Sequence, residues 1–476
     1  MGKAEKKPRY KKFMSLSEVL AYSVGLFGFQ LIIGFLNSYQ AEFYGSIMGA
    51  SLAVVGILIL IGKIVSAGFD PIVGNLIDRN KSKHGKLKPF ILYSLIPLFL
   101  LTIVIFIKVP FSGAGLYVYI FITNLLWCLS MTLGDVPSQG IASVLTPSST
   151  ERTDVVSIAN TFKAIGFAAA GAIVPIVCIC VAGGSKVFTA NDDPISSLEF
   201  LVTAIVIALL GCLMFSLIFF KNKERVQYKA EKMSFKDMWF VFKDNKPLML
   251  VVISYFLGFG RQMQMGIQIQ AANVFMQGQN SVLLLGIPMA IGSMLSMVLV
   301  PILIKKFDEK KVFIGMSLYG FIISLATFFV GTNTMWLMLT MLGLCGLQFG
   351  AVTIMPIIMT ADCVDYYEWK TGKRNEGTAY ALLTLTIKVG IALGTALALI
   401  LVGVSGYKAD AATFSAGTKN WVYAAYALLP GIFSLLAIIP MLKYDIVGKK
   451  KLQINEELQE RRAKFAQENA EENTID

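Results

Sequence analysis

The feature that most constrains this chain is a series of about twelve long apolar stretches. The loops that join them are alternately rich and poor in basic residues. Lys and Arg are crowded into every second loop, as at 79–88, 221–246, 305–311 and 370–374. Three of the loops between them, at 41–50, 277–281 and 332–335, contain neither residue type. About 20 apolar residues cross a bilayer as a helix, and basic loops stay in the cytoplasm. The pattern therefore predicts an all-α protein of the plasma or inner membrane. Both of its termini are expected in the cytoplasm.

Composition excludes several other classes of protein. With 55% hydrophobic and only 15% charged residues among 476, the chain is too apolar for a soluble protein of this length. The net charge of +12 sits in short loops beside the spans, where it attracts anionic lipid rather than nucleic acid. Nearly all of the cysteines lie inside apolar spans and are interpreted as small hydrophobic residues. His84 is the only histidine, which excludes histidine-rich metal chemistry.

The spans divide into two sets around a polar stretch. They are predicted at 15–40, 51–77, 89–109, 115–146, 154–182 and 198–220, and then at 247–276, 281–304, 311–331, 334–360, 375–404 and 420–443. The predicted organisation is a basic N-terminal tail (1–14), a six-helix bundle (15–220), a cytoplasmic linker (221–246), a second six-helix bundle (247–446) and a solvated tail (447–476) with a helix near Leu452–Phe465.

This layout resembles the major facilitator superfamily, in which two pseudo-symmetric six-helix halves hold a site near the membrane midplane. The run Gly74-Asn-Leu-Ile-Asp78-Arg79 ends the second span. It is similar to the start of the loop signature of that superfamily. The resemblance implies a fold of twelve transmembrane helices.

Ionisable side chains inside apolar spans are costly and are therefore candidates for function. They are Lys63, Asp70, Asp135, Lys163, Arg261 and Lys388. Lys63 and Asp70 are two helical turns apart and share a face with Ser66. Pro71 deprives a preceding carbonyl of its usual donor, so the face offers hard oxygen ligands for a small cation or a proton. The alternative is a structural ion pair between Lys63 and Asp70.

Two further polar stripes stand out. Cys128, Thr132, Asp135 and Gln139 follow one face of the fourth span, and Arg261, Gln264 and Gln268 follow one face of the seventh. Such amides, carboxylates and basic groups around a wet cavity hydrogen-bond hydroxyl-rich ligands. For the glutamines, interhelical hydrogen bonding is an equal alternative.

Two longer segments are similar to the glycoside–pentoside–hexuronide:cation symporters, the melibiose-carrier family. One runs from Asp70 to Phe90, and the other runs ungapped from Ala361 to Tyr380 and on to Gly390. The resemblance implies cation-coupled uptake of a glycoside, pentoside or hexuronide by alternating access, without enzymatic activity. It implies no cofactor and no metal beyond a transported sodium ion.

The resemblance assigns roles to matching positions. It places the coupling cation at Asp70, Thr132 and the position of Ser66, and the sugar at Asp135, Thr384 and Lys388. Ser66 replaces a family carboxylate, which favours the proton over sodium as the coupling ion. Family sugar contacts are also replaced at Gln30, Gln139, Ala159 and Thr353, so the sugar is expected to be held differently. Lys63, Arg261 and Lys388 leave room for an anionic sugar such as a glucuronide.

Charges at the span ends suggest a gate. Contacts between the halves that close the cytoplasmic mouth are predicted for Asp78, Arg79, Arg152, Asp362, Asp365 and Glu368. The alternative is that these charges only solvate and cap helix ends. Two other functions remain open: a lysolipid symporter, which the polar stripes disfavour, and an intramembrane enzyme, for which no catalytic set is evident. The expected partners are a small sugar and membrane lipid, with a functional monomer.

Overall fold

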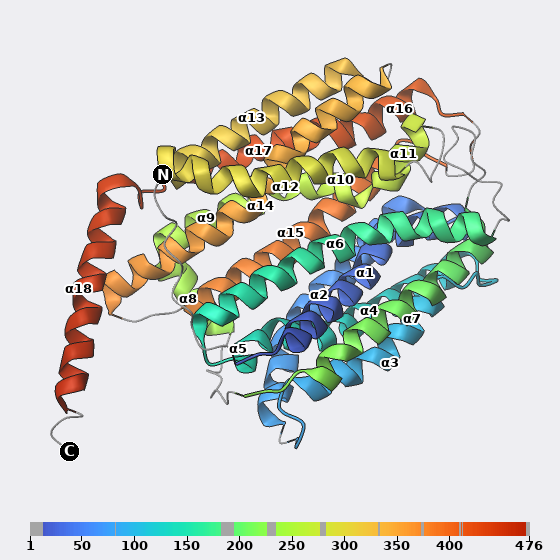
Figure 1. The fold of residues 1–476 in the computed structure, drawn as a ribbon. Helices are drawn as coiled ribbons and strands as arrows, with labels where there is room; N and C mark the ends of the chain where they lie inside the picture. The colour runs from blue at the N-terminus through green and yellow to red at the C-terminus, as the bar shows by residue number, and fades with distance from the viewer. Residues whose placement is uncertain are drawn as a thin grey trace, which may run out of the picture. The chain divides into compact units, whose positions relative to one another are not determined.

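The computed structural model describes residues 13–80, 82–181, 195–225, 235–276, 282–331, 334–372, 376–408, 411 and 413–472. Every regular element within these ranges is a helix (Figure 1). The chain groups into two compact units. The first comprises Met1–Lys232 with the short segments Met276–Ser281 and Lys408–Ala412, and the second comprises Met233–Phe275, Val282–Tyr407 and Thr413–Asp476.

The helices of the first unit have clear local start signals. They are α1 (Leu16–Ser46), α2 (Leu52–Arg79), α3 (Lys88–Ile105), α4 (Gly113–Gly140), α5 (Ala142–Leu145), α6 (Ser149–Val181) and α7 (Ser197–Lys221). Ser15 caps α1 and Ser196 caps α7, each with a glutamate three residues later that returns a hydrogen bond to the cap. This reciprocal capping box satisfies backbone donors that a helix start otherwise leaves open.

The second unit contains shorter helical pieces as well as long helices. They are α8 (Phe235–Asp244), α9 (Lys246–Leu257), η1 (Gly258–Gln262), α10 (Met263–Gly266), α11 (Gln268–Met276), α12 (Val282–Phe307), α13 (Glu309–Val330), α14 (Met335–Thr371), α15 (Glu376–Val404), α16 (Ala416–Tyr423), η3 (Ala424–Leu428), α17 (Leu429–Met441) and α18 (Gly448–Glu472).

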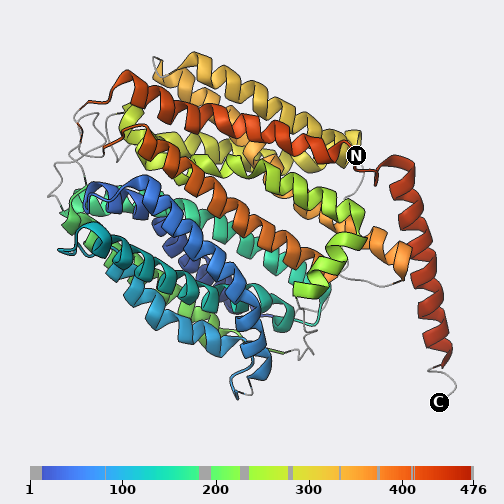
Figure 2. The same cartoon turned by 180° about the vertical axis from the view of Figure 1, so that it is seen from behind.

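The seventh predicted span is not one continuous helix, so that prediction was wrong. Residues 247–276 divide into α9, the 3-10 turn η1, α10 and α11. The break begins at Gly258 and Gly260, which are poor helix formers. A Cβ at Gly260 would lie 2.1 Å from the ring of Phe433, so a side chain of α17 fills that space. From behind, the orange helix α15 runs alongside these yellow-green pieces (Figure 2).

The two units repeat the same helix pairings. In the first, α1 packs on α6 and α7, α2 on α4, and α3 on α4 and α7. In the second, the pieces of the broken span pack on α15 and α17, α12 on α14, and α13 on α14 and α17. This correspondence is the internal repeat expected of the fold.

Ten helices in the described part of the chain are long and apolar enough to cross a membrane. The two remaining predicted spans correspond to α6 and to the broken segment. At about 1.5 Å per residue, the 37 residues of α14 cover roughly 55 Å, which exceeds the ~30 Å hydrocarbon core. Its end, with Asp362, Asp365 and Glu368, therefore extends beyond the apolar layer.

Small residues allow the helices to approach closely. A Cβ at Gly28 of α1 would lie 2.6 Å from the carbonyl oxygen of Gly211 in α7. In the second unit, a Cβ at Gly346 of α14 would lie 2.3 Å from the carbonyl oxygen of Met289 in α12. Backbone contact of this kind is the usual packing mode of membrane helices.

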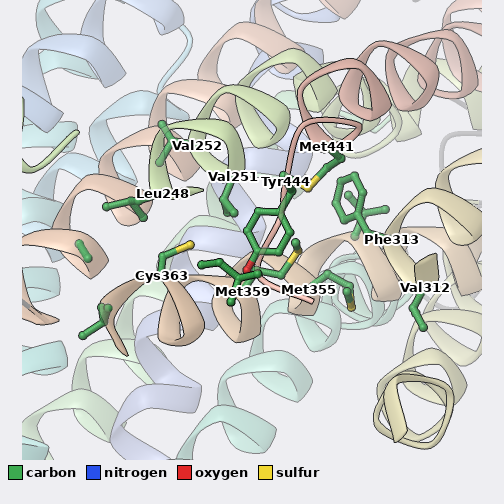
Figure 3. Close-up of a cluster of buried hydrophobic side chains, with 14 of the residues drawn as sticks. Leu248, Val251, Val252, Val312, Phe313, Met355, Met359, Cys363, Met441 and Tyr444 are labelled. Atoms are coloured by element: carbon green, nitrogen blue, oxygen red, sulfur yellow. The ribbon is translucent and has the colours of Figure 1, made fainter. Parts of the chain in front are cut away.

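An apolar cluster stabilises one end of the second unit. Figure 3 shows Tyr444 pointing toward Met355 and Met359 of α14, with Val251 of α9 beside them. Ile454 and Leu458 of α18 are buried in the same cluster. The prediction of a solvated tail was therefore wrong for the first half of α18. That helix runs from Gly448 to Glu472 and is longer than predicted.

Candidate functional site

Two of the predicted cation residues meet between α2 and α4. Ser66 Oγ and Thr132 Oγ1 lie 3.0 Å apart, and both side chains are buried. Thr132 Oγ1 also donates to the carbonyl of Cys128 at 3.1 Å, so Ser66 supplies the proton between the two hydroxyls. Both oxygens therefore retain acceptor capacity for a further ligand.

Asp70 lies one helical turn beyond Ser66 on α2 and is half-buried. Pro71 follows it inside the helix and cannot supply the backbone donor that residue 67 would normally receive. A carboxylate, two hydroxyls and an under-satisfied carbonyl are thus placed along one stretch of α2 and α4. All of these groups are hard oxygen ligands.

Lys63 is bonded to a residue that the sequence analysis did not select. Its Nζ donates to Asn37 Oδ1 of α1 at 2.9 Å. A pair between Lys63 and Asp70 is not among the salt bridges that join described residues. The alternative of a structural ion pair is therefore not what the structure contains. A cluster of polar residues in the second half of the first span, with Gln30, Asn37 and Gln40, was the available signal for Asn37.

More polar contacts join α1 to α4 beside Lys63. Gln40 Nε2 donates to Asn124 Oδ1 at 3.1 Å and lies 3.4 Å from the hydroxyl of Tyr44. A Cβ at Gly62 would lie 2.3 Å from Asn124 Nδ2, so α2 presses its backbone against this amide. We refer to Asn37, Gln40, Lys63 and Asn124, with the Ser66–Thr132 pair, as the three-helix junction. Only Lys63, Ser66 and Thr132 of it were predicted.

The predicted sugar residues of the first unit lie one or two turns from this junction. Asp135 is buried on α4, and its Oδ2 accepts a hydrogen bond from Gln139 Nε2 at 2.9 Å. Two members of the predicted stripe of the fourth span, Asp135 and Gln139, are therefore hydrogen-bonded to each other. Gln30 lies half-buried on α1.

Arg261 is the most deeply buried basic group that we identify in the second unit. It is 1% exposed and lies in η1. Its guanidinium carbon lies 3.9 Å from the centre of the Tyr255 ring. Within the part of the chain that the structure describes, none of its three guanidinium nitrogens has a hydrogen-bond partner. A buried cation held only by an aromatic ring retains its capacity to bind an acceptor.

Gln264 and Gln268 make interhelical bonds instead of sharing one face with Arg261. Gln264 Nε2 donates to the carbonyl of Tyr426 at 3.0 Å, and Gln268 Nε2 donates to that of Val282 at 3.3 Å. The break after Ile267 turns the two side chains toward different elements. These bonds favour the interhelical alternative for both glutamines.

Thr384 and Lys388 lie one turn apart on α15, and both are half-buried. They come from the second unit, whereas Asp135 belongs to the first. The prediction that all three bind one sugar stays a prediction.

The charges predicted to form a gate have local contacts in each unit. Arg152 Nη2 donates to the carbonyl of Thr146 at 3.3 Å, and Arg79 is exposed. Asp365 and Glu368 are half-buried on the end of α14. The side chain of Asp78 lies outside the described residues.

Asp362 takes part in an ion cluster that the sequence did not reveal. Lys451 Nζ of α18 lies 2.8 Å from Asp362 Oδ2 and 2.6 Å from Glu309 Oε1 at the start of α13. Burial lowers the pKa of Lys451, but hydrogen bonds and attraction from the two carboxylates outweigh it and raise that pKa overall. In addition, Trp369 Nε1 donates to Glu457 Oε2 at 2.6 Å. These contacts attach α18 to α13 and α14.

Two repeated helical units that hold charged side chains within apolar helices define a membrane transporter of the major facilitator fold. Solved transporters share this fold. The nucleoside transporter NupG matches with a TM-score of 0.61 at 14% identity, covering 90% of this chain and 100% of that one. The inward-open xylose transporter XylE from E. coli matches with a TM-score of 0.58 at 15% identity, covering 93% and 99%.

Residues 21–448 match the model of the MFS/sugar transport protein family, and the chain belongs to that family. It is 27% identical to the uncharacterized symporter YnaJ of Bacillus subtilis (strain 168), over 94% of this chain and 96% of that protein. It is 26% identical to the isoprimeverose transporter of Lactiplantibacillus pentosus, over 97% and 94%. It is 25% identical to a glucuronide carrier protein homolog of Escherichia coli (strain K12), over 94% and 96%. The chain is therefore a multi-pass membrane transporter and not an enzyme.

Proposed function

We propose that this protein takes up a glycoside, pentoside or hexuronide together with a cation, by alternating access across a cytoplasmic membrane. The observation that carries the proposal is the contact of Ser66 with Thr132, beside Asp70 and one turn from Asp135. A cation site next to a buried carboxylate suited to sugar hydroxyls is what coupling requires. Relatives named as an isoprimeverose transporter and a glucuronide carrier homolog support a sugar substrate.

In this proposal, Asp70 carries the coupling charge with Ser66 and Thr132 as neighbours. The proton is favoured over sodium because a single carboxylate binds a metal cation more weakly than two. Asp135 accepts hydrogen bonds from sugar hydroxyls, and Thr384 and Lys388 complete the site from the second unit. Both termini face the cytoplasm, as the Lys and Arg distribution implies.

Substrate counterflow in proteoliposomes tests the proposal directly. A panel of neutral glycosides, pentosides and hexuronides is offered to vesicles preloaded with unlabelled sugar. Exchange of at least one member, driven uphill by a proton gradient, is the expected result. Exchange of lysolipid and of no sugar would establish the alternative of a lysolipid symporter.

Arg261 favours a hexuronide among these substrates. Its guanidinium is buried, and its nitrogens have no hydrogen-bond partner within the described residues. Guanidinium groups bind carboxylates in a planar, bidentate geometry. A uronic acid carries such a carboxylate, whereas a neutral pentoside does not. The counterflow panel separates the two by the ratio of their exchange rates.

The charged helix ends are proposed to gate the cytoplasmic mouth. Asp365 and Glu368 on the extended end of α14, and Arg79 and Arg152 in the first unit, have opposite charge. Each exposed pair contributes at most ~1 kcal/mol, but several bias two states that are close in free energy. Charge reversal in Asp365→Lys is expected to favour the inward-open state in spin-label distance measurements. An unchanged distance distribution would contradict the gate.

A further inference from the structure

Lys63 lies where three helices of the first unit meet. It is on α2, its Nζ donates to Asn37 Oδ1 of α1 at 2.9 Å, and Cys128 of α4 is an electrostatic neighbour. Asp70 is two turns further along the same helix. A lysine inside a membrane-spanning helix is costly unless polar groups or a functional role compensate for it.

The Lys63 ammonium bonds to the amide oxygen of Asn37 at 2.9 Å, and further oxygen atoms belong to nearby positions of α2 and α4. The amide oxygens of Asn37 and Asn124 and the hydroxyls of Ser66 and Thr132 all belong to the three-helix junction. Amide and hydroxyl oxygens are the ligands that hard cations such as Na⁺ take in proteins. An ammonium group uses the same oxygens as hydrogen-bond acceptors. Lys63 and a sodium ion therefore require the same environment.

The hydroxyl pair of Ser66 and Thr132 also bears on whether a sodium ion can bind beside Lys63. Ser66 Oγ and Thr132 Oγ1 are hydrogen-bonded to one another at 3.0 Å, one helical turn from Lys63 along α2. A sodium ion added at this pair would be a second positive charge about one turn from Lys63. In a weakly polarisable interior, like charges at such separations repel strongly.

We propose that the ammonium of Lys63 is a tethered substitute for a coupling sodium ion. It supplies the positive charge at the three-helix junction, so Na⁺ does not bind there and transport runs without a sodium gradient. This inference rests on the proposed function in so far as it places cation coupling at Asp70, Ser66 and Thr132. Lys63 thereby determines the specificity for the driving ion.

The experiment measures thermal unfolding of the purified full-length protein in NaCl and in choline chloride of equal ionic strength. Three changes at one position separate charge from space. Lys63→Ala removes the ammonium and opens room among the oxygens, Lys63→Asn does so and adds an oxygen, and Lys63→Met removes the charge but fills the room. Lys108→Gln, at an exposed lysine outside the junction, is the control for the loss of one positive charge.

The wild type, Lys63→Met and Lys108→Gln are expected to unfold at the same temperature in both salts. Lys63→Ala and Lys63→Asn are expected to gain a sodium-dependent rise of about 2 °C or more, because a newly bound ion stabilises the folded state. A wild type stabilised specifically by Na⁺ would overturn the proposal. So would folded Lys63→Ala and Lys63→Asn proteins that are indifferent to Na⁺, because a purely structural bond from Lys63 to Asn37 predicts that result.

This readout uses no sugar, so it stays informative whatever the counterflow panel shows. A protein that exchanges a glycoside and is also driven by a sodium gradient would refute the role of Lys63 and leave sugar transport intact. If the protein exchanges no sugar while Lys63→Ala acquires the sodium response, the proposed sugar substrate is wrong. The proposal that Lys63 replaces a sodium ion is then still supported.

Discussion

Each unit holds a cation that stands out inside a predicted membrane span, Lys63 in the first and Arg261 in the second, and the surroundings of these two cations differ. Lys63 of the first unit donates a hydrogen bond to Asn37 Oδ1 at 2.9 Å. Arg261 of the second unit lies against the face of Tyr255 at 3.9 Å. In the described part of the chain, its nitrogens have no hydrogen-bond acceptor.

The difference indicates which cation is already satisfied. A desolvated cation–π contact contributes about 2 kcal/mol, whereas the effective cost of taking an ion out of water is several kcal/mol. Arg261 is therefore a net cost to stability unless an anion reaches it. Lys63, in contrast, donates a hydrogen bond to the amide oxygen of Asn37. A hydrogen-bonded cation in the first unit and a cation without a hydrogen-bond acceptor among the described residues of the second fit coupling in the first unit and anion recognition in the second.

The largest effect is expected from removing the coupling carboxylate of the first unit. Asp70→Asn keeps the shape of the side chain and abolishes its charge, so concentrative uptake should fall to the downhill level. Counterflow exchange, which needs no driving ion, should persist. Both are measured with labelled substrate in the same vesicles. Full accumulation by this variant would show that Asp70 and the neighbouring three-helix junction do not couple transport to the cation.

A large effect on affinity is expected at Asp135. A carboxylate that accepts hydrogen bonds from sugar hydroxyls contributes about 1.5–3 kcal/mol, which corresponds to roughly a ten- to hundredfold weaker Kd in Asp135→Ala. Direct binding measurements on purified protein provide the value. Asp154→Ala, at an exposed carboxylate of α6, is the matched control and should bind normally. Equal affinity in both variants would place the sugar elsewhere.

A moderate effect, opposite in sign for stability and for function, is expected at Arg261. Replacing an uncompensated buried charge by methionine is expected to leave stability unchanged or to raise it by about 1–4 kcal/mol. The same Arg261→Met change should slow exchange of hexuronides relative to neutral glycosides. Thermal unfolding and the exchange ratio are measured on one preparation. A strongly destabilised variant with an unchanged ratio of hexuronide to neutral glycoside exchange would contradict this prediction. Arg261 would then stabilise the fold by packing and would not bind an anion.

The smallest effect is expected where α18 is attached to the second unit. Lys451→Met removes the contacts to Glu309 and Asp362, leaves these two carboxylates without their shared cation, and should increase hydrogen exchange along α18. Lys450→Met removes the neighbouring pair with exposed Asp445 and should change exchange less. Equal exchange in the two variants would show that apolar packing alone holds the helix.

The pH dependence of this attachment follows from the raised pKa of Lys451. A raised pKa in the folded state means that the stabilisation is complete below the ordinary lysine value of 10.5 and is lost as the pH rises through the folded value. The contribution of Lys451 to the protection of α18 from exchange should therefore fall as the pH rises through its raised pKa in alkaline solution. In Lys451→Met that alkaline loss should be absent.

The sequence by itself determined the class of this protein. Apolar length and the alternation of basic loops are local properties, and they predict membrane helices and a two-unit repeat before any contact is known. The capping boxes at Ser15 and Ser196 are equally local. Periodicity also placed Asp135 and Gln139 on one face, where they are bonded. The family pattern implied the approach of Ser66 and Thr132.

Only the tertiary structure decided which partner each polar face meets. Periodicity assigns Lys63 to a face of α2, but it does not say that Asn37 of α1 lies opposite and takes the bond. It treats residues 247–276 as one regular helix, whereas the ring of Phe433 fills the space at Gly260 and the helix breaks there. It predicts an exposed tail, whereas Ile454 and Leu458 are buried against an apolar surface that distant segments of the chain form. Contacts between helices depend on how closely backbones approach, and that distance is set by side chains far apart in the sequence.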